Sequence, residues 1–79
     1  MTMGSHADDE LAGAALIGAT DTEARAIVER LLDAAGIEYF IEGSVVYSVQ
    51  VRPDDLALAR EILRSSSELK DHWIQFPVE

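Results

Sequence analysis

The sequence has no cysteine, only two prolines, and few aromatic side chains, which make up 6% of its 79 residues. The absence of cysteine excludes disulfides, thiolate metal sites and cysteine nucleophiles. The longest apolar run, residues 11–19, is well short of the roughly 20 residues of a membrane-spanning helix. The acidic Asp8-Asp9-Glu10 before it is the opposite of the positive start of a secretory signal. We therefore expect a cytoplasmic protein with no membrane partner.

Positive charge is scarce as well. Six Lys and Arg stand against fifteen Asp and Glu, which gives a net charge of −9 and a pI near 4.4. Binding to phosphate backbones requires clustered cations, and RNA-reading sheets also carry stacking aromatics. The sequence offers neither, so nucleic acid is excluded as a partner. An acidic surface instead attracts basic proteins, in an association that salt weakens.

At 79 residues and 8.6 kDa, the chain has the size of one small domain. Such a chain buries only about 60–65% of the surface that it exposes when unfolded, so a large internal active site is not expected. We divide it into a disordered segment, residues 1–10, an α+β domain, residues 11–66, and a tail, residues 67–79. The tail either packs on the domain or docks to a partner.

The first half of the domain predicts a strand followed by a helix. Residues 11–19 favour a strand because each of their two glycines would cost a helix about 1 kcal/mol. Thr20 and Glu23 fit a capping box, with Thr20 as the N-cap, and Gly36 stands where a left-handed residue ends a helix. The apolar residues between are spaced for one helix face: Ala24, Ile27, Val28, Leu31, Leu32 and Ala35.

Residues 37–42 and 45–51 are rich in β-branched and aromatic side chains and flank Gly43-Ser44, which predicts a hairpin. A two-residue turn would put the apolar side chains of the two strands on opposite faces. A three-residue loop over residues 42–44 keeps them on one face, so burial selects it. In that register the helix-facing pairs are Ile41 with Val45, Tyr39 with Tyr47, and Ile37 with Val49.

Pro53 predicts the start of a second helix, with Asp54 and Asp55 in the first turn, where the helix dipole favours anions. Residues 65–67 end it. Its inward positions are Leu56, Ala59, Ile62 and Leu63, with Leu58 at the margin.

The order of elements, β-α-β-β-α, predicts a ferredoxin-like α+β fold with two helices on one face of an antiparallel sheet. A short C-terminal edge strand can complete it, since Ile74 and Phe76 alternate with Trp73 and Gln75. Pro77 would confine that strand to a sheet edge.

Three segments of the chain resemble a known family: Leu31-Leu32-Asp33-Ala34-Ala35-Gly36-Ile37, Val51-Arg52-Pro53-Asp54-Asp55 and Ala59-Arg60-Glu61-Ile62-Leu63. With them, residues 14–64 are similar to small bacterial signal-transducing proteins, domains of unknown function. The resemblance implies a half-ferredoxin fold related to nitrogen-regulatory signal proteins. It implies no catalytic residues, because the shared positions are helix caps and core positions.

We expect no enzyme and no cofactor. His72, with Asp71 and Glu68 nearby, lacks the further nitrogen or sulfur ligands typical of zinc, so no metal site is predicted. The helix dipole accounts for Asp54 and Asp55 without a substrate, so no catalytic residue is assigned.

Two binding sites remain as hypotheses. Gly18 and Thr20, at the first strand-to-helix turn, could hold a small ligand, which would make the protein a sensor. The leading hypothesis is a non-enzymatic regulatory module that binds a basic protein partner and self-associates through a sheet edge or the uncovered sheet face. Glu38 and Glu42 on the predicted edge strand oppose edge pairing. The candidate interaction residues are Phe40, Val46, Trp73, Ile74 and Phe76.

Overall fold

The computed structural model describes residues 11–77, in which the strands and helices follow one another in the predicted order. The strands are β1 (Ala12–Gly18), β2 (Tyr39–Glu42), β3 (Val46–Val51) and β4 (Ile74–Gln75), and the helices are α2 (Thr22–Ala34) and α3 (Leu56–Ser65). Two short 3-10 turns, η1 (Pro53–Asp55) and η2 (Ser67–Leu69), precede and follow α3. The segment predicted to be disordered, residues 1–10, lies outside the described residues.

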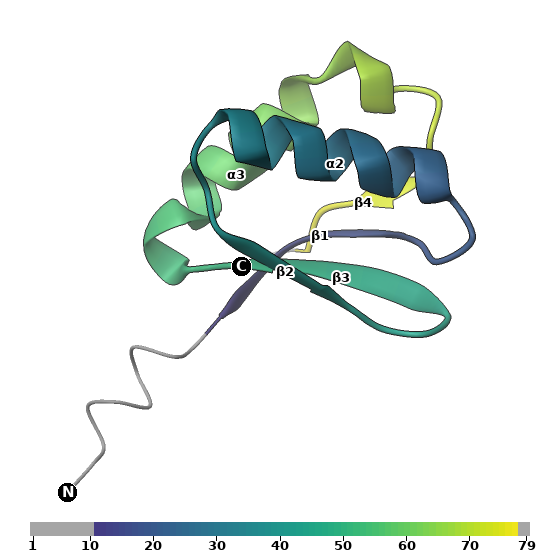
Figure 1. The fold of residues 1–79 in the computed structure, drawn as a ribbon, viewed down its shortest axis with the longest axis horizontal. Coiled ribbons are helices and arrows are strands. Elements are labelled where there is room, and N and C mark those ends of the chain that lie inside the picture. Colours follow the sequence, from purple (N-terminus) through teal and green to yellow (C-terminus); the bar gives the residue numbers. More distant parts are fainter. Residues whose placement is uncertain (1–10, 78–79) are drawn as a thin grey trace, which may run out of the picture.

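The four strands form one antiparallel sheet in the order β2-β3-β1-β4, and both helices lie on one side of it (Figure 1). β1 and β2 both run antiparallel to β3, which lies between them, so β1, α2 and β2 form a split βαβ unit. This is the predicted ferredoxin-like α+β arrangement, with β4 as the short C-terminal edge strand. Neither helix in residues 11–77 is long and apolar enough to cross a bilayer.

The two ends of α2 are closed by different devices. The capping box predicted at Thr20 is wrong by one residue, because Asp21 is the N-cap and its Oδ1 accepts a backbone N–H three residues later at 3.0 Å. A carboxylate satisfies an orphan donor and also lies in the positive field of the helix start. At the other end, Gly36 has φ +73 as predicted, and Ile37 donates its N–H to the carbonyl of Leu32 at 3.0 Å.

The hairpin has the predicted faces but not the predicted register. Ile41 pairs with Val49 and not with Val45, and Tyr39 pairs with Val51. The register is shifted along β3 by an even number of residues, so most of the same side chains face the helices in either register. Val45 is the exception, because it lies in the turn and is 83% exposed instead of covered by the helices.

The turn at Gly43 explains the shift. Gly43 has φ +134, and a Cβ there would lie 2.0 Å from the backbone oxygen of Val46, so the chain folds back more tightly than a side chain allows. The start of β3 then pairs with β1 and not with β2, because Val46 lies opposite Gly18. The ladder between β2 and β3 therefore begins only at the pair of Glu42 and Ser48.

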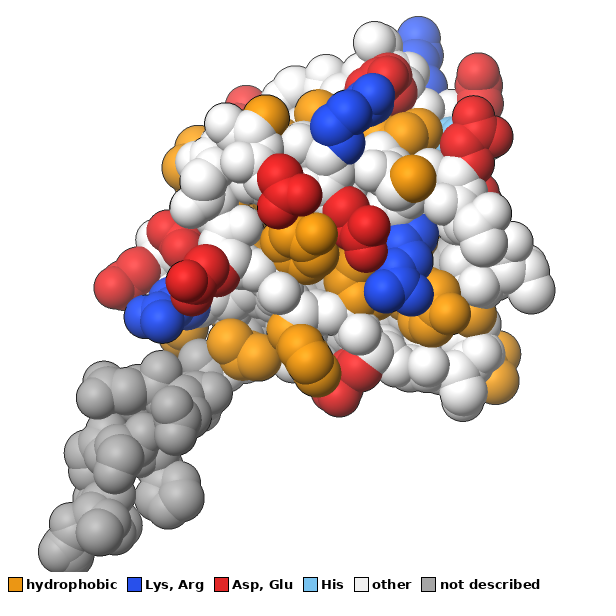
Figure 2. Space-filling model, viewed as in Figure 1, with side chains coloured by type: hydrophobic (Ala, Val, Ile, Leu, Met, Phe, Trp, Pro, Cys, Tyr) orange, Lys and Arg blue, Asp and Glu red, His pale blue; other side chains and the backbone are white. Residues whose placement is uncertain are grey.

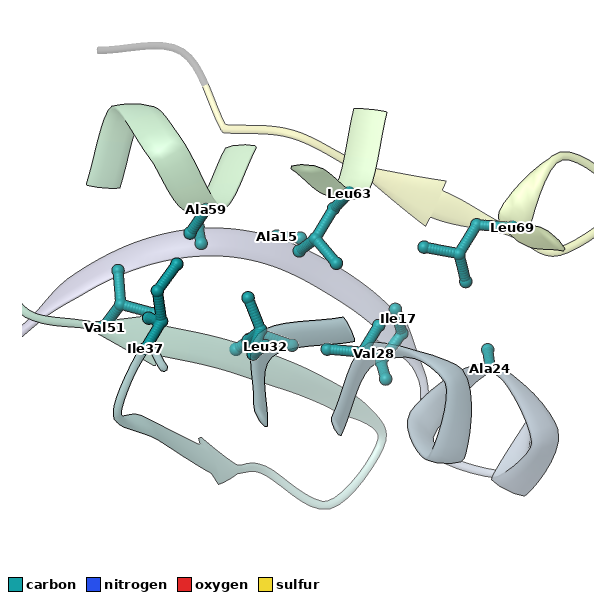
Figure 3. Packing of buried hydrophobic residues seen from close by; sticks show 12 residues of the cluster. Ala15, Ile17, Ala24, Val28, Leu32, Ile37, Val51, Ala59, Leu63 and Leu69 are labelled. Atoms are coloured by element: carbon teal, nitrogen blue, oxygen red, sulfur yellow. The ribbon is translucent and has the colours of Figure 1, made fainter. Parts of the chain in front are cut away.

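The core lies between the sheet and the helices and contains many small side chains (Figure 3). The register of β1 against β3 shifts between Gly13 and Ala15, and this bulge accompanies full burial of both Ala14 and Ala15. The helices cover β1 with the predicted residues, except that Ala35 is exposed. Their fully or almost fully buried side chains are Ala24, Val28 and Leu32 from α2, and Ala59 and Leu63 from α3.

The chain after α3 packs on this core. Leu69 in η2 is only 2% exposed, and Ile74 in β4 pairs with Ile17 in the sheet. Arg30 in α2 forms an ion pair with Glu68, which ties η2 to the first helix. Residues 67–77 therefore complete the sheet and cover one end of the helical layer.

Candidate functional site

The first strand-to-helix turn, where Gly18 and Thr20 were expected to hold a ligand, is occupied by its own capping group. The carbonyl of Gly18 accepts the N–H of Asp21 at 3.1 Å, and Thr20 is exposed in the turn. The carboxylate of Asp21 takes the helix-start donor that an anionic ligand would use, and it supplies a negative charge there. The geometry therefore disfavours an anion at this turn.

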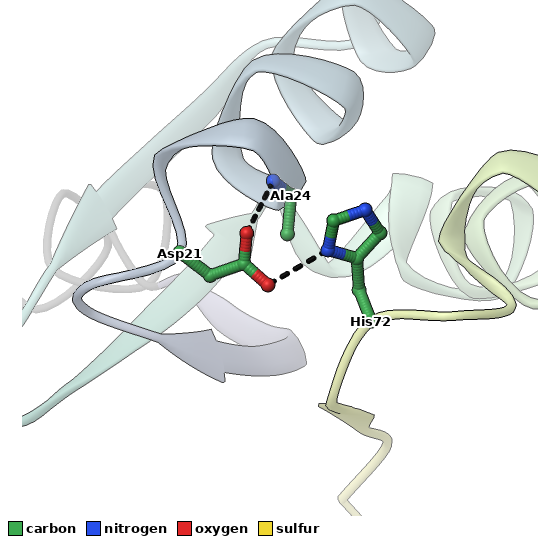
Figure 4. A network of polar contacts seen from close by, with 3 residues as sticks. All are labelled: Asp21, Ala24 and His72. Carbon is green, nitrogen blue, oxygen red and sulfur yellow. Dashed lines mark hydrogen bonds and ion pairs between the residues drawn. The ribbon is translucent and has the colours of Figure 1, made fainter.

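His72 completes this turn from a distant part of the chain. Its Nδ1 lies 2.7 Å from Oδ2 of Asp21, and the two side chains are only 16% and 29% exposed (Figure 4). The hydrogen bond to Asp21 raises the pKa of His72, and the carboxylates of Glu23 and Asp71 raise it further. The same bond, with the helix-start N–H of Ala24, lowers the pKa of Asp21. The pair links the cap of α2 to the segment before β4.

The metal-ligand cluster considered around His72 does not assemble. His72 is directed to Asp21, and Glu68 is paired with Arg30. In residues 11–77 no group of three or more acidic or histidine side chains is arranged to hold a metal ion. The second helix begins at Leu56 and not at Pro53, so Asp54 and Asp55 lie in the 3-10 turn η1 just before α3 and not, as predicted, in its first turn.

The sheet has one face that no described element covers. By the strand register, its side chains are those of Phe40 and Glu42 in β2, of Val46, Ser48 and Gln50 in β3, of Leu16 in β1 and of Gln75 in β4. Phe40 is 52% exposed and Val46 is 37% exposed, so both predicted interaction residues of this face are open to solvent. We call this surface the open face.

The remaining predicted interaction residues are divided between two environments. Ile74 and Phe76 pack against the core, and Arg64 lies over the Phe76 ring with 5.2 Å between the guanidinium carbon and the ring centroid. Trp73 stays 54% exposed. The structure therefore does not bring the five predicted residues together, and places only Phe40 and Val46 by register on the open face.

The outer edge of β2 is the edge at which Glu38 and Glu42 were expected to oppose self-pairing. β2 pairs with β3 alone, so its other side has no strand beside it within residues 11–77. The carboxylates of Glu38 and Glu42 flank this edge. The Glu38 side chain is 79% exposed, and its Oε1 lies 3.3 Å from a guanidinium nitrogen of Arg52. We call residues 38–42 the β2 edge.

A shallow depression of about 510 Å³ adjoins the β2 edge where α2 ends. Its lining is Asp33, Gly36, Ile37, Glu38 and Tyr39. Partial burial raises the pKa of the Tyr39 hydroxyl, and the negative charges of Glu29 and Asp33 raise it further. The depression is thus acidic and beside an aromatic ring, a setting that favours a cation. It could not be predicted from the sequence, because it forms only where the end of α2 and the start of β2 meet.

Comparisons with protein-family models, with curated proteins and with solved structures find no match to this chain. The resemblance to small bacterial signal-transducing proteins therefore stays a prediction from the quoted segments.

Proposed function

We propose that this protein is a non-enzymatic interaction module of signal transduction, which binds a basic protein partner through the open face of its sheet. The observation that carries the proposal is the pair of exposed apolar residues on an uncovered sheet face, Phe40 and Val46, on a chain of net charge −9. Exposed aromatic and β-branched side chains supply contact area, while the surrounding carboxylates favour positive partners.

The acidic surroundings of this site come from several elements. Glu42 lies on the open face beside Gln50, whose Nε2 donates to its Oε2 at 3.1 Å. On the adjoining side of the molecule, which carries α2, acidic, basic and hydrophobic side chains lie beside one another (Figure 2). On such mixed surfaces, charge attracts the partner and apolar contact holds it. A higher ionic strength should therefore weaken binding mainly by lowering the association rate.

A small-ligand sensor at Gly18 and Thr20 is the second candidate function. It needs a ligand that tolerates the Asp21 carboxylate, so a cationic or neutral compound suits the turn better than a phosphate. A thermal-shift screen against cationic and neutral amino acids tests it, with nucleotides as the anionic compounds that should not bind. A bound ligand at 100 times its Kd would add about 2.7 kcal/mol of stability.

The interaction function is tested by affinity capture from the native cell with matched surface variants. Phe40→Ser and Leu58→Ser remove equally exposed side chains, each 52% exposed, but Leu58 lies on α3 and away from the open face. We expect Phe40→Ser, alone or with Val46→Ser, to lose partners that the wild type and Leu58→Ser retain. Partners identical across all variants would contradict an open-face interaction.

A further inference from the structure

Resting on the proposed function, we infer that the β2 edge is the strand-addition site for the partner: an extended segment of another protein, with Lys or Arg at alternate positions, pairs beside β2 as a fifth strand. The β2 edge and the open face are continuous, because Phe40 belongs to both.

The two edges of the sheet differ in their capacity to accept a strand. β4 is two residues long, Pro77 follows shortly after it, and Arg60 binds the Pro77 carbonyl at 2.8 Å. β2 is four residues long and has neither a proline nor a covering strand in the part of the chain that the structure describes. Backbone donors and acceptors along an uncovered strand are a template for an incoming one, so β2 is the edge that can take it.

Charge selects the incoming strand. Phe40 and Glu42 share one face of the sheet by their pairing with β3, and Glu38, just before β2, continues the same alternation. The carboxylate of Glu38 is 79% exposed and also pairs with Arg52. An incoming strand with Lys, an apolar residue and Lys at alternate positions matches this series, since opposite charges across neighbouring strands stabilise the pair. A basic side chain extending past the start of β2 would reach the depression beside Asp33 and Tyr39.

The same charges act against a second copy of this chain. An antiparallel pairing of two β2 edges centred on Phe40 would place Glu38 of each copy opposite Glu42 of the other. Like charges directly opposite each other destabilise a strand pair. The β2 edge thus combines an open backbone with a charge pattern that rejects itself and accepts a basic strand.

The test is a titration of the full chain, labelled with ¹⁵N, with the capped peptide Thr-Lys-Thr-Val-Thr-Lys-Thr. We expect the largest backbone amide shifts at residues 38–43. Two further peptides separate charge from strand pairing, one with Glu in place of Lys and one with alternate backbone amides N-methylated. Both should bind at least about tenfold more weakly, because the first reverses the charge match and the second removes the strand hydrogen bonds.

Protein variants give the matched control. Glu42→Gln keeps the size of the side chain and its contact with Gln50, and should weaken the peptide about threefold, as expected for one exposed charge pair. Glu61→Gln makes the same charge change on the exposed surface of α3 and should leave the affinity unchanged. Equal binding of the N-methylated peptide, shifts confined to residues 46–50, or equal effects of the two variants would overturn the inference.

The outcomes also separate this inference from the proposed function. If the peptide does not bind at residues 38–43 but Phe40→Ser still loses a captured partner, the open-face function stands and strand addition is wrong. If the peptide binds there as expected but no captured partner depends on Phe40 or Val46, strand addition stands and the open-face function is wrong.

Discussion

The two edges of the sheet are built in opposite ways. The β4 edge is held by side chains from the rest of the molecule: Leu69 is buried, His72 binds Asp21, and Arg60 binds the Pro77 carbonyl. Among residues 11–77 nothing closes the β2 edge in these ways, and it carries the exposed carboxylates of Glu38 and Glu42. One edge is thus protected by packing and the other by charge, and only protection by charge can be lifted by a suitable partner.

The largest effect should come from removing the apolar anchor of the β4 edge. Leu69→Ala leaves a cavity under η2 and should lower the free energy of unfolding by about 2–4 kcal/mol. Leu58→Ala, on the exposed surface of α3, should change it by less than about 0.5 kcal/mol. Urea denaturation of both variants measures the difference. A loss at Leu69 no larger than that at Leu58 would show that the β4 edge is not anchored by packing.

The hydrogen-bonded pair of His72 and Asp21 at the β4 edge should make the stability of the protein depend on pH. The raised pKa of His72 means that the folded state holds its proton more tightly, so this stabilisation is present below the ordinary pKa of 6.5 and is lost as the pH rises through the raised value. The lowered pKa of Asp21 has the opposite sense, and its contribution is present above the ordinary value of 3.8 and is lost as the pH falls. The pair stabilises most between those two values.

Melting temperatures at pH 5.5 and pH 8 check this dependence. The wild type should lose stability between the two, whereas His72→Ala should be less stable at pH 5.5 and show a flatter profile. His6→Ala, at the other histidine of the chain, is the matched control and should keep the wild-type profile. A His72→Ala profile as steep as that of the wild type would mean that another group sets the pH dependence.

The smallest effect concerns the β2 edge. Glu38→Lys would set a lysine opposite Glu42 when two edges pair around Phe40, so repulsion becomes attraction and the variant should form a weak dimer. Glu38→Lys combined with Glu42→Lys restores like charges and should sediment at low salt as the wild type does. Sedimentation velocity at two salt concentrations compares them. A dimer in both variants, or in neither, would show that charge does not control this edge.

The sequence predicted the structure correctly where neighbouring residues alone determine it. Three predictions of this kind are correct. They are the helix from the apolar spacing along α2, the left-handed conformation of Gly36, and the strand from the glycine-containing segment at β1. The face of each hairpin strand was also largely predictable, because burial determines the parity of the register.

The rest depended on contacts between distant residues. Two registers that differ by an even number of residues put the same side chains on the same face, so burial cannot distinguish them. The pairing of Ile41 with Val49 is determined instead by the turn at Gly43 and by the pairing of β3 with β1. Asp21 and His72 are far apart in the sequence, and neither residue alone indicates that one caps a helix while the other binds that cap. The acidic depression at the start of β2 likewise needs Asp33 and Tyr39 side by side.

The place of β1 in the sheet has a consequence for synthesis of the chain. β1 is an interior strand, yet one of its neighbours, β4, comes from the last described residues. While the polypeptide is being translated, β1 and β3 emerge before residues 67–77, and the second side of β1 has no partner strand in that interval. Until β4 pairs with it, β1 is an additional strand edge of the nascent chain, one that the folded residues 11–77 no longer expose.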